Sequence, residues 1–418
     1  LKTVARTEED HHTRLMMRWK PVLLLFAIFG FLAVAFALFF GALSIFDSPL
    51  YAFRLLAYGN SDTDDFKIFA ERRIEKASLP SFIERTTLDI PAQVSLPYSG
   101  EQRTENIEEF LKKADTRAFL VIKDDRIAVE KYWNSSRDSI NTSFSVVKSF
   151  DSAMIGAAIS DGLIGSVDDP VIEYIPEIAG RGLDQLTIRN LIRMDTGIEY
   201  KHNFEIPFFR IPFGDDARTY YGGNLHRVAF SVRPSASPIG PAFRYNNYHP
   251  LLEGIIIERV TRMPVAKYLE QKIWKPMGAE YDASWSLDQS DGFEKMESGL
   301  NARAIDYARF GLLYLHQGKW NGKNILPAEW VRISTTPDSP ERPFDTFQGW
   351  QKLGGYYAYH FWGLHAPNNQ NDFMAMGNYG QIIYVAPRKN IVIVRLGSRD
   401  SQTIPFGVLF RELVNQIR

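Results

Sequence analysis

Ser145 and Lys148 are the residues whose types and spacing most directly suggest a catalytic pair. A serine hydroxyl is a weak nucleophile at neutral pH and needs a base within hydrogen-bond distance. Residues three apart share one face of a helix, so Lys148 would stand beside the Ser145 hydroxyl at a helix start. There the helix dipole also favours developing negative charge. The run 149–161 is rich in small and apolar residues and stops before Gly162, as expected of a buried helix. Because Ser-x-x-Lys also occurs by chance, further elements are needed to support the pair.

A second candidate element is formed by Tyr245 and Asn247, just before a helical pattern that begins near Pro250. A phenol beside a Ser–Lys pair can relay a proton if a nearby ammonium stabilises its ionised form. An amide two residues further on can orient the lysine or hold a substrate carbonyl. The alternative is a turn with a buried aromatic side chain.

A third candidate element is the segment 377–381, Gly-Asn-Tyr-Gly-Gln, which leads into a strand. Glycines in a strand usually mark a bulge or a close approach of another backbone. A strand edge lined by substrate would fit, and an ordinary hairpin entry is the alternative.

Two aromatic groups are weaker candidates. A loop-like stretch holds Asp215, Asp216, Tyr220 and Tyr221, and a cluster that fits core packing better than a pocket holds Tyr356, Tyr357, Tyr359, Phe361 and Trp362.

Composition excludes several classes of function. The 418 residues, 45% of them hydrophobic, can bury one large core with an inserted subdomain. With 48 Lys+Arg against 49 Asp+Glu, the formal charge of −1 gives no bulk attraction for nucleic acid. The 8 His lack H-E-x-x-H spacing, so we expect no metal and no cofactor. Without cysteine the chain has no disulfide, no thiolate zinc site and no cysteine nucleophile, and its redox compartment stays open.

Residues 21–46 form an uncharged apolar run that predicts a membrane-spanning helix. Arg14, Arg18 and Lys20 precede it and Asp47 follows, so the positive-inside rule places residues 1–20 in the cytoplasm and the rest on the periplasmic, extracytoplasmic side. A cleaved signal peptide is the alternative, but its apolar region is typically about 7–15 residues. We therefore expect a single-pass membrane protein in contact with lipid. A helix partner is a further expectation, because small residues recur four apart at Ala33, Ala37 and Gly41.

The remaining pattern predicts an α/β domain. Residues 47–100 are expected to be an extended connector, and the folded domain covers 101–418. Strand patterns over 117–122 and 127–133 form one hairpin, and those over 381–385 and 391–396 form another, followed by a helix over 406–417. Between them, about 163–345, lies a mainly helical subdomain with helical patterns over 188–194, 250–261, 265–274 and 304–316. Strands at both ends imply a sheet closed by distant segments.

Taken in order, the three elements resemble the serine β-lactamase and penicillin-binding-protein superfamily, in particular its class C-like esterases, D-alanyl peptidases and 6-aminohexanoate-dimer hydrolases. The resemblance extends from about Phe119 to Val414. It is strengthened by three landmarks that match the family in order, at residues 186–197, 274–278 and 299–310. It implies a central antiparallel sheet flanked by helices, with a helical subdomain.

Carried over by position, the resemblance implies Ser145 as the acylated nucleophile and Lys148 as its base. Tyr245 would relay the proton to the leaving group, and Asn247 would contact Lys148 and substrate. The hairpin at Gly380 would bring the backbone N–H of Gln381 to join that of Ser145 in an oxyanion hole.

One position departs from the family pattern. The third motif usually begins with Lys or His, and here Asn378 occupies that position. A cation that would hold a substrate carboxylate is missing, which favours amides or esters without a free carboxylate over β-lactams.

Three functions follow from these expectations. The first is a membrane-anchored serine hydrolase that forms an acyl-enzyme on a small amide or ester. The second is a non-catalytic subunit or binding module that keeps the fold in a membrane assembly, and the third is a peptidoglycan-binding or stress-sensing module without turnover. Retention of Ser145, Lys148 and Tyr245 together favours the hydrolase.

Overall fold

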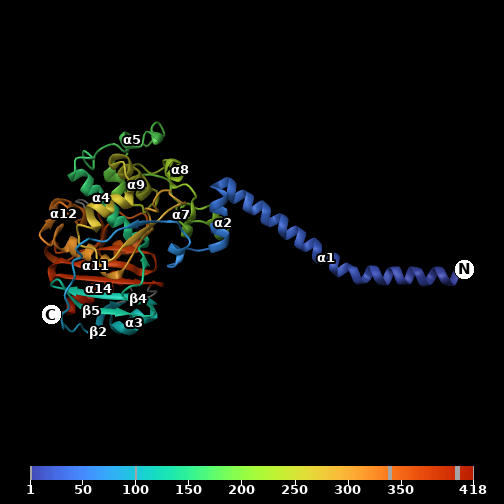
Figure 1. Cartoon of the computed structure of the whole chain (residues 1–418), viewed down its shortest axis with the longest axis horizontal. Helices are drawn as coiled ribbons and strands as arrows, with labels where there is room; N and C mark the ends of the chain where they lie inside the picture. The colour runs from blue at the N-terminus through green and yellow to red at the C-terminus, as the bar shows by residue number, and fades with distance from the viewer. Residues whose placement is uncertain (1, 99–100, 338–340, 401–404, 418) are drawn as a thin grey trace.

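A seven-stranded antiparallel sheet lies at the centre of the computed structural model, which describes residues 2–98, 101–337, 341–400 and 405–417. The strand order is β11-β12-β13-β14-β15-β4-β5. The strands are β4 (Thr116–Lys123), β5 (Arg126–Tyr132), β11 (Gly355–Tyr357), β12 (Trp362–Leu364), β13 (Asp372–Gly377), β14 (Gln381–Ala386) and β15 (Ile391–Gly397). Since β15 pairs with β4, the two ends of the domain close the sheet, as the sequence predicts (Figure 1).

Both faces of this sheet are buried. Successive side chains of a strand point to opposite sides, and β15 shows this directly. Val392 and Val394 join the core that includes α4 (Val147–Ser160) and α11 (Ala304–Leu315), whereas Ile391 and Ile393 join the core that includes α14 (Phe406–Gln416). The predicted hairpins and the terminal helix are therefore confirmed, and helices cover the sheet on both sides.

Residues 163–345 are mainly helical, as predicted, but they also contain strands. The helices of this region and just after it are α5 (Val171–Tyr174), η3 (Pro176–Ile178), α6 (Ile188–Ile192), η4 (Asn203–Glu205), η5 (Phe208–Phe213), α7 (Asp215–Tyr221), α8 (Leu225–Phe230), α9 (Tyr248–Thr261), α10 (Val265–Leu269), the π-helical η6 (Glu270–Trp274), α12 (Ala328–Thr335) and α13 (Gln348–Lys352). Its strands are β7 (Ala283–Ser286), β8 (Leu300–Ala302), β9 (Lys319–Trp320) and β10 (Lys323–Asn324). Strands this short carry no recognisable period, which is why the sequence does not show them.

The prediction of an extended connector over residues 47–100 is wrong for much of its length. It contains α2 (Pro49–Tyr58), η1 (Asp65–Lys67), β1 (Glu71–Ile74) and β2 (Gln93–Tyr98). β1 pairs with β7 in a second sheet of order β1-β7-β8-β6, where β6 is Asn141–Thr142, and β2 pairs with β3 (Glu101–Asn106), which leads into α3 (Ile107–Lys113). β1 owes its strand to the distant partner β7, so a local pattern is not required.

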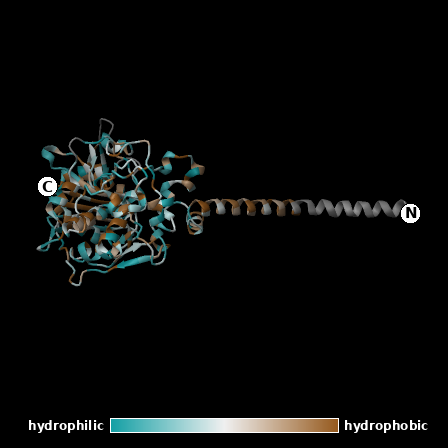
Figure 2. Cartoon of the chain, turned by 90° about the horizontal axis from the view of Figure 1, so that it is seen from above, coloured by the Kyte–Doolittle hydropathy of each residue, from teal (hydrophilic) through white to brown (hydrophobic). Residues whose placement is uncertain are grey.

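The N-terminal helix α1 (Lys2–Phe46) projects from the domain (Figure 1). Residues 1–20 are expected as a separate tail, yet from Lys2 onward they continue the same helix. Its segment Leu24–Phe46 has 23 residues, is exposed except near its C-terminal end, and is long and apolar enough to span a membrane, although a signal sequence would look the same. Figure 2 shows the hydrophobic residues along this half of α1 up to the domain.

Candidate active site

The Ser145 hydroxyl and the Lys148 amine meet in the structure. Lys148 Nζ lies 2.9 Å from Ser145 Oγ and also donates to the carbonyl oxygen of Glu297 at 3.0 Å. Lys148 is 1% exposed, whereas Ser145 is only partly buried. The amine is thus held by two oxygens in a protected position, and the hydroxyl remains accessible. This is the arrangement that the spacing of the two residues predicts.

Ser145 belongs to a tight turn that precedes the helix rather than to the helix itself. The turn is η2 (Phe144–Val146), and Phe144 has a left-handed φ of 43°. Such backbone strain persists where surrounding contacts enforce it. Here Ser143 N donates to Leu300 O at 2.8 Å, and the Phe144 ring stacks on Tyr220 with centroids 6.4 Å apart. β8 and α7 therefore fix the turn that presents the hydroxyl.

Tyr245 completes the group from the loop before α9. Lys148 Nζ lies 5.0 Å from the centroid of its ring, a distance typical of a cation–π contact. The ring stacks on Trp362 with centroids 6.0 Å apart, and the backbone is held by a bond from Tyr245 N to Thr346 Oγ1 of 2.8 Å. Two segments far apart in sequence, 145–148 and the loop with Tyr245, therefore bring Ser145, Lys148 and Tyr245 together.

Asn247 is near this group but bonded differently from the sequence expectation. Its Nδ2 donates to Tyr200 Oη at 2.9 Å, while the hydrogen bonds of Lys148 go to Ser145 and Glu297. The Oδ1 atom of Asn247 is buried and has no hydrogen-bond partner among the described residues. Tyr200, whose own hydroxyl donates to Asp216 at 2.6 Å, is a partner that the sequence analysis missed. The amide oxygen is thus the free end of a fixed side chain.

The third element forms the hairpin between β13 and β14. Gly377 packs against the nucleophile turn: a Cβ at this position would lie 2.6 Å from Ser143 O and 2.8 Å from Ser145 N. The predicted close backbone approach is therefore present. β13 is an inner strand of the sheet, but β12 pairs only with Asp372, Phe373 and Met374, so the half of β13 next to Ser145 has a neighbour on one side only.

The hairpin loop itself does not support the predicted roles of its residues. The backbone N–H of Gln381 donates to Asn378 O within η8 (Asn378–Gly380), so it is already used inside the turn. The side chain of Gln381 is buried against Gly397, with a bond of 3.1 Å from Gly397 N to its Oε1. Asn378 is exposed, and Gly380 has a φ of 71° and packs against Arg395. The assignment of Gln381 as an oxyanion donor conflicts with this geometry.

The comparison with known proteins agrees with the site. Residues 104–406 match the family model described as Beta-lactamase. The chain belongs to the beta-lactamase family. It is 27% identical over 305 residues to a 6-aminohexanoate-dimer hydrolase of Paenarthrobacter ureafaciens, a match that covers 71% of this chain and 76% of the relative.

Solved structures with the same fold agree with this membership. A Bacillus anthracis protein assigned as a 6-aminohexanoate-dimer hydrolase superposes with a TM-score of 0.69 at 23% identity, over 85% of this chain and 91% of that one. A penicillin-binding protein of Bacillus halodurans superposes with a TM-score of 0.56 at 16% identity, over 73% and 98%. The chain is thus a serine hydrolase of the beta-lactamase family, with the antiparallel sheet and flanking helices of that fold.

The acidic and aromatic residues 215–221 form one wall of this beta-lactamase-family site. The sequence predicts a loop here, but the segment is the helix α7. Asp215 accepts a hydrogen bond from Tyr248 at 2.7 Å, and Asp216 accepts one from Tyr200 at 2.6 Å. Tyr220 donates to Asp65 at 3.0 Å, and Lys295 lies 4.2 Å from its ring centroid. The wall is therefore made of bonded side chains. The cluster 356–362 belongs to the core, as predicted, and Trp362 also contacts Tyr245.

A group of buried acids beneath Lys148 was missed by the sequence analysis. Both carboxylate oxygens of Asp151 are buried without a hydrogen bond among the described residues. Burial, and then the charge of Glu253, raise the pKa of Asp151 well above its usual range. Glu253 itself pairs with His360 at 2.8 Å. Asp151 lies three residues after Lys148, so the helical spacing that links Ser145 to Lys148 would also have pointed to it.

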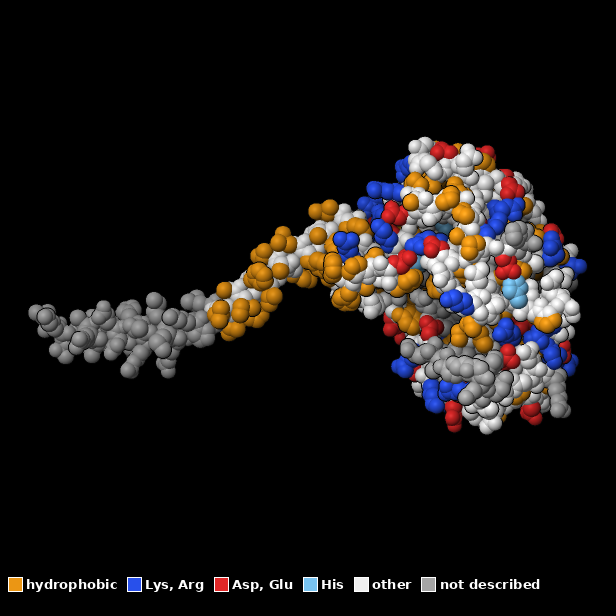
Figure 3. Space-filling view, turned by 180° about the vertical axis from the view of Figure 1, so that it is seen from behind, with side chains coloured by type: hydrophobic (Ala, Val, Ile, Leu, Met, Phe, Trp, Pro, Cys, Tyr) orange, Lys and Arg blue, Asp and Glu red, His pale blue; other side chains and the backbone are white. Residues whose placement is uncertain are grey.

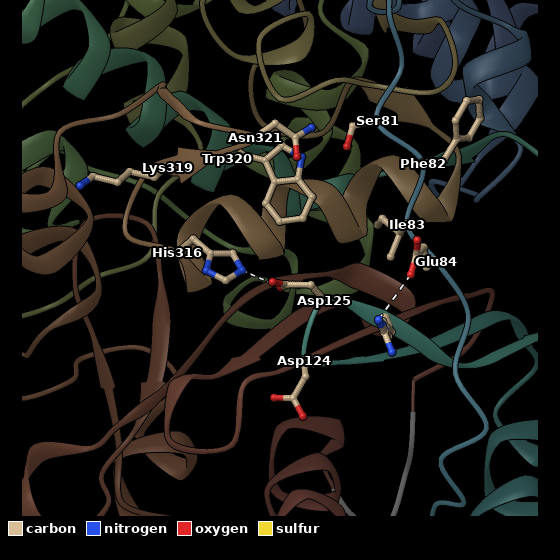
Figure 4. A pocket seen from close by; sticks show the side chains of 11 residues that line it. Ser81, Phe82, Ile83, Glu84, Asp124, Asp125, His316, Lys319, Trp320 and Asn321 are labelled. Carbon is tan, nitrogen blue, oxygen red and sulfur yellow. Dashed lines mark hydrogen bonds and ion pairs between the residues drawn. The ribbon is translucent and has the colours of Figure 1, made fainter.

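A separate cavity of about 590 Å³ carries no comparable chemistry (Figure 4). It lies between the segment 81–84, the β4–β5 turn and the end of α11. His316 pairs with Asp125 at 2.6 Å, and Figure 4 shows its ring turned to Asp125 and away from Ser81. The close contact of Lys148 Nζ with Ser145 Oγ therefore lies outside this cavity.

Proposed function

We propose that this protein is a membrane-anchored serine hydrolase that forms an acyl-enzyme on Ser145 from a small amide or ester. The observation that carries the proposal is the 2.9 Å separation of Lys148 Nζ and Ser145 Oγ. A base at hydrogen-bond distance is what a serine needs to attack a carbonyl carbon.

Proton movement in this proposal uses Lys148 and Tyr245. As Ser145 Oγ attacks, its proton passes to the amine of Lys148. The leaving amine or alkoxide takes a proton from the Tyr245 hydroxyl, and the Lys148 ammonium returns one to the phenolate. Water then attacks the acyl-enzyme and gives up its proton along the same path, so acid and free Ser145 are released. Lys148 Nζ lies 5.0 Å from the centroid of the Tyr245 ring, so the two groups are neighbours on the path proposed for this proton.

Charge on the carbonyl oxygen would be stabilised by the backbone N–H of Ser145 and by one from the free edge of β13. That half of β13 is open on the side away from β14 and lies against Ser145 at Gly377. An unpaired strand edge offers backbone donors, and one oxyanion donor is worth about 3 kcal/mol. In this proposal the edge of β13 supplies the second oxyanion donor in place of Gln381, because the N–H of Gln381 already donates to Asn378 O. The open Oδ1 of Asn247 would accept a hydrogen bond from a substrate N–H.

The substrate is proposed to be recognised without a carboxylate-binding cation. Lys295 is buried and bonded to Tyr220 and Glu297, and Arg388 pairs with Asp372 at 3.2 Å at the far end of β13. A relative is named for the 6-aminohexanoate dimer, which does carry a carboxylate. Comparing that dimer with its C-terminal amide, which lacks the carboxylate, therefore tests this part directly.

Membrane anchoring by α1 is the second part of the proposal, with the N-terminus in the cytoplasm and the domain outside it. Support comes from the exposed apolar stretch Leu24–Phe46 and from Arg14, Arg18 and Lys20 before it. Protease added to intact spheroplasts should digest the domain and spare the tail. Digestion of the tail alone would reverse the orientation.

A fluorophosphonate probe tests the catalytic part. The full chain in detergent should gain one probe by intact mass, and Ser145→Ala should gain none. Hydrolysis of p-nitrophenyl esters, linear amides and a β-lactam would then rank substrate classes. Wild-type protein that binds a substrate but neither reacts with the probe nor turns over would favour the non-catalytic binding module.

A further inference from the structure

The segment 201–213 lies alongside the end of the apolar helix. The Phe213 ring packs edge-on against Phe39 and Phe46 of α1, with centroids 6.2 and 5.5 Å apart. Phe39 precedes Phe46 by seven residues, which is roughly 10 Å along a helix axis. A ring that contacts both therefore sits beside the last two turns of the apolar stretch Leu24–Phe46.

Large apolar side chains next to Phe213 are exposed. Phe208 is 87% exposed, Phe209 72% and Phe204 69%. Soluble surfaces rarely leave several such residues together in water, and a group of them marks a site of contact. Figure 3 shows hydrophobic side chains along α1 up to its junction with the domain. The exposed rings thus continue the apolar surface of α1 onto the domain.

A cationic groove lies beside these rings. Its volume is about 670 Å³, and its lining includes Phe46, Phe213 and four basic residues, Lys201, Arg210, Arg218 and Arg233. Two acidic residues of the lining are engaged: Glu199 pairs with Lys201, and Asp215 accepts from Tyr248. Arg218 pairs with Asp47 at 3.4 Å.

Two cations of this groove are available for an outside ligand. Arg210 and Arg233 are exposed and make no ion pair among the described residues. Figure 3 shows Lys and Arg side chains beside the α1 junction. Apolar rings at the depth of a membrane helix, with guanidinium groups next to them, match the order of acyl chains and headgroups in a lipid leaflet.

We propose that residues 201–213, with Arg210 and Arg233, form a docking site for the membrane surface, in which the groove takes the phosphate headgroup of an anionic phospholipid. The inference rests on the proposed anchoring by α1 and adds a second contact of the domain with the same leaflet. His202 connects these exposed rings with the loop that carries Tyr245. Its ring stacks on Phe204 with centroids 4.8 Å apart, and its Nε2 donates to Tyr245 O at 2.9 Å. Docking would therefore hold the Tyr245 loop close to the lipid surface.

The absence of cysteine makes a direct test simple. Phe208→Cys in the full chain is labelled with an environment-sensitive fluorophore and reconstituted into phosphatidylcholine vesicles with or without phosphatidylglycerol, together with a nitroxide-labelled lipid. The matched control is Phe82→Cys, a phenylalanine 73% exposed beside the cavity of Figure 4. We expect lipid quenching at position 208 and none at position 82.

Charge variants test the groove. Each basic residue near an anionic leaflet changes the docking equilibrium by roughly fivefold, so Arg210→Gln with Arg233→Gln should lower the docked-to-undocked ratio by about 25-fold. Lys319→Gln with Lys323→Gln, two exposed cations on β9 and β10, should leave it unchanged. Equal docking of both double variants, or no preference for phosphatidylglycerol, would refute the headgroup site.

Separate readouts distinguish this inference from the proposals beneath it. Flotation with vesicles reports insertion of α1, and fluorophosphonate labelling of Ser145 reports catalysis. Flotation without quenching at position 208 refutes docking alone. Loss of flotation refutes the anchoring and the inference with it. A label shielded from water but not quenched by lipid would mean that a protein, such as a second copy of this chain, covers the rings, and would also refute lipid docking.

Discussion

The two sides of the candidate active site are held in different ways. On one side, Lys148 is buried and bonded to Ser145 and Glu297, and Tyr245 is packed against Trp362. On the other, the hairpin loop at Asn378 is exposed, although Gly377 beneath it touches the nucleophile turn. The first side is fixed by several distant segments at once. We infer that the chemistry depends on the packed side and that the loop adjusts recognition.

Removing the nucleophile or its base is the largest expected effect. Ser145→Ala and Lys148→Ala should each lower acylation by at least about 10³-fold, and the double variant should lose little more, because residues that act as a unit are non-additive. Probe labelling and ester hydrolysis measure the loss, and circular dichroism checks the fold. Undiminished turnover in Ser145→Ala would contradict the assignment.

Loss of the Tyr245 hydroxyl should come next. Tyr245→Phe keeps the ring over Lys148 and against Trp362, so the fold should survive while kcat falls roughly 10²- to 10⁴-fold. The control is Tyr379→Phe in the hairpin loop between β13 and β14, because it removes a hydroxyl that donates to Ser61 O. We expect that control to lose less than about tenfold. Equal losses in both variants would remove the relay role from Tyr245.

Gly377→Ala probes the contact between the two sides. Its new Cβ would lie 2.6 Å from Ser143 O and 2.8 Å from Ser145 N, so backbone must shift at the nucleophile. A displacement near 1 Å costs roughly 10²-fold in rate. Gly349→Ala is the matched control, because nothing lies within 4 Å of its added Cβ. Full activity of Gly377→Ala would show that the hairpin tolerates movement next to Ser145.

Much of the packed side follows from the sequence, because its signals are local. Helical spacing predicts that Ser145 meets Lys148, and Gly162, with a φ of 71°, follows the end of α4 as expected. The strand patterns over 381–385 and 391–396 predict β14 and β15. The bond from Lys148 to Glu297 and the one from Asn247 to Tyr200 are different, since each joins residues far apart in sequence. Pairing of β1 with β7 likewise depends on tertiary contacts that no single-sequence pattern contains.

Substitution of Asp151 tests how much its buried carboxyl group on the packed side lowers the free energy of unfolding. Burial and Glu253 raise its pKa in the folded protein. Above the unfolded pKa of about 3.9, the unfolded chain releases this proton while the folded one retains it, so the contribution to stability falls as pH rises toward the folded pKa. Asp151→Asn should therefore raise the melting temperature more at pH 7 than at pH 4, as thermal unfolding would show. An equal change at both pH values would mean that Asp151 is ionised in the folded protein.

The smallest effect is expected at Asn378. A lysine in the family's third motif can pair with a substrate carboxylate, and charge-assisted bonds are about twice as strong as neutral ones. In a buried cleft, such a charged hydrogen bond would contribute roughly 1–3 kcal/mol to binding. Asn378 is exposed, and ion pairs on an exposed surface contribute only about 0–1 kcal/mol. Asn378→Lys should therefore raise acylation by penicillins no more than about fivefold over its effect on an uncharged ester. Asn321→Lys, exposed between β9 and β10, controls for net charge. A gain of a hundredfold would place the loop inside the recognition site and make it as important for activity as the packed side. Efficient β-lactam turnover by the wild-type chain would show that β-lactam recognition needs no cation at position 378.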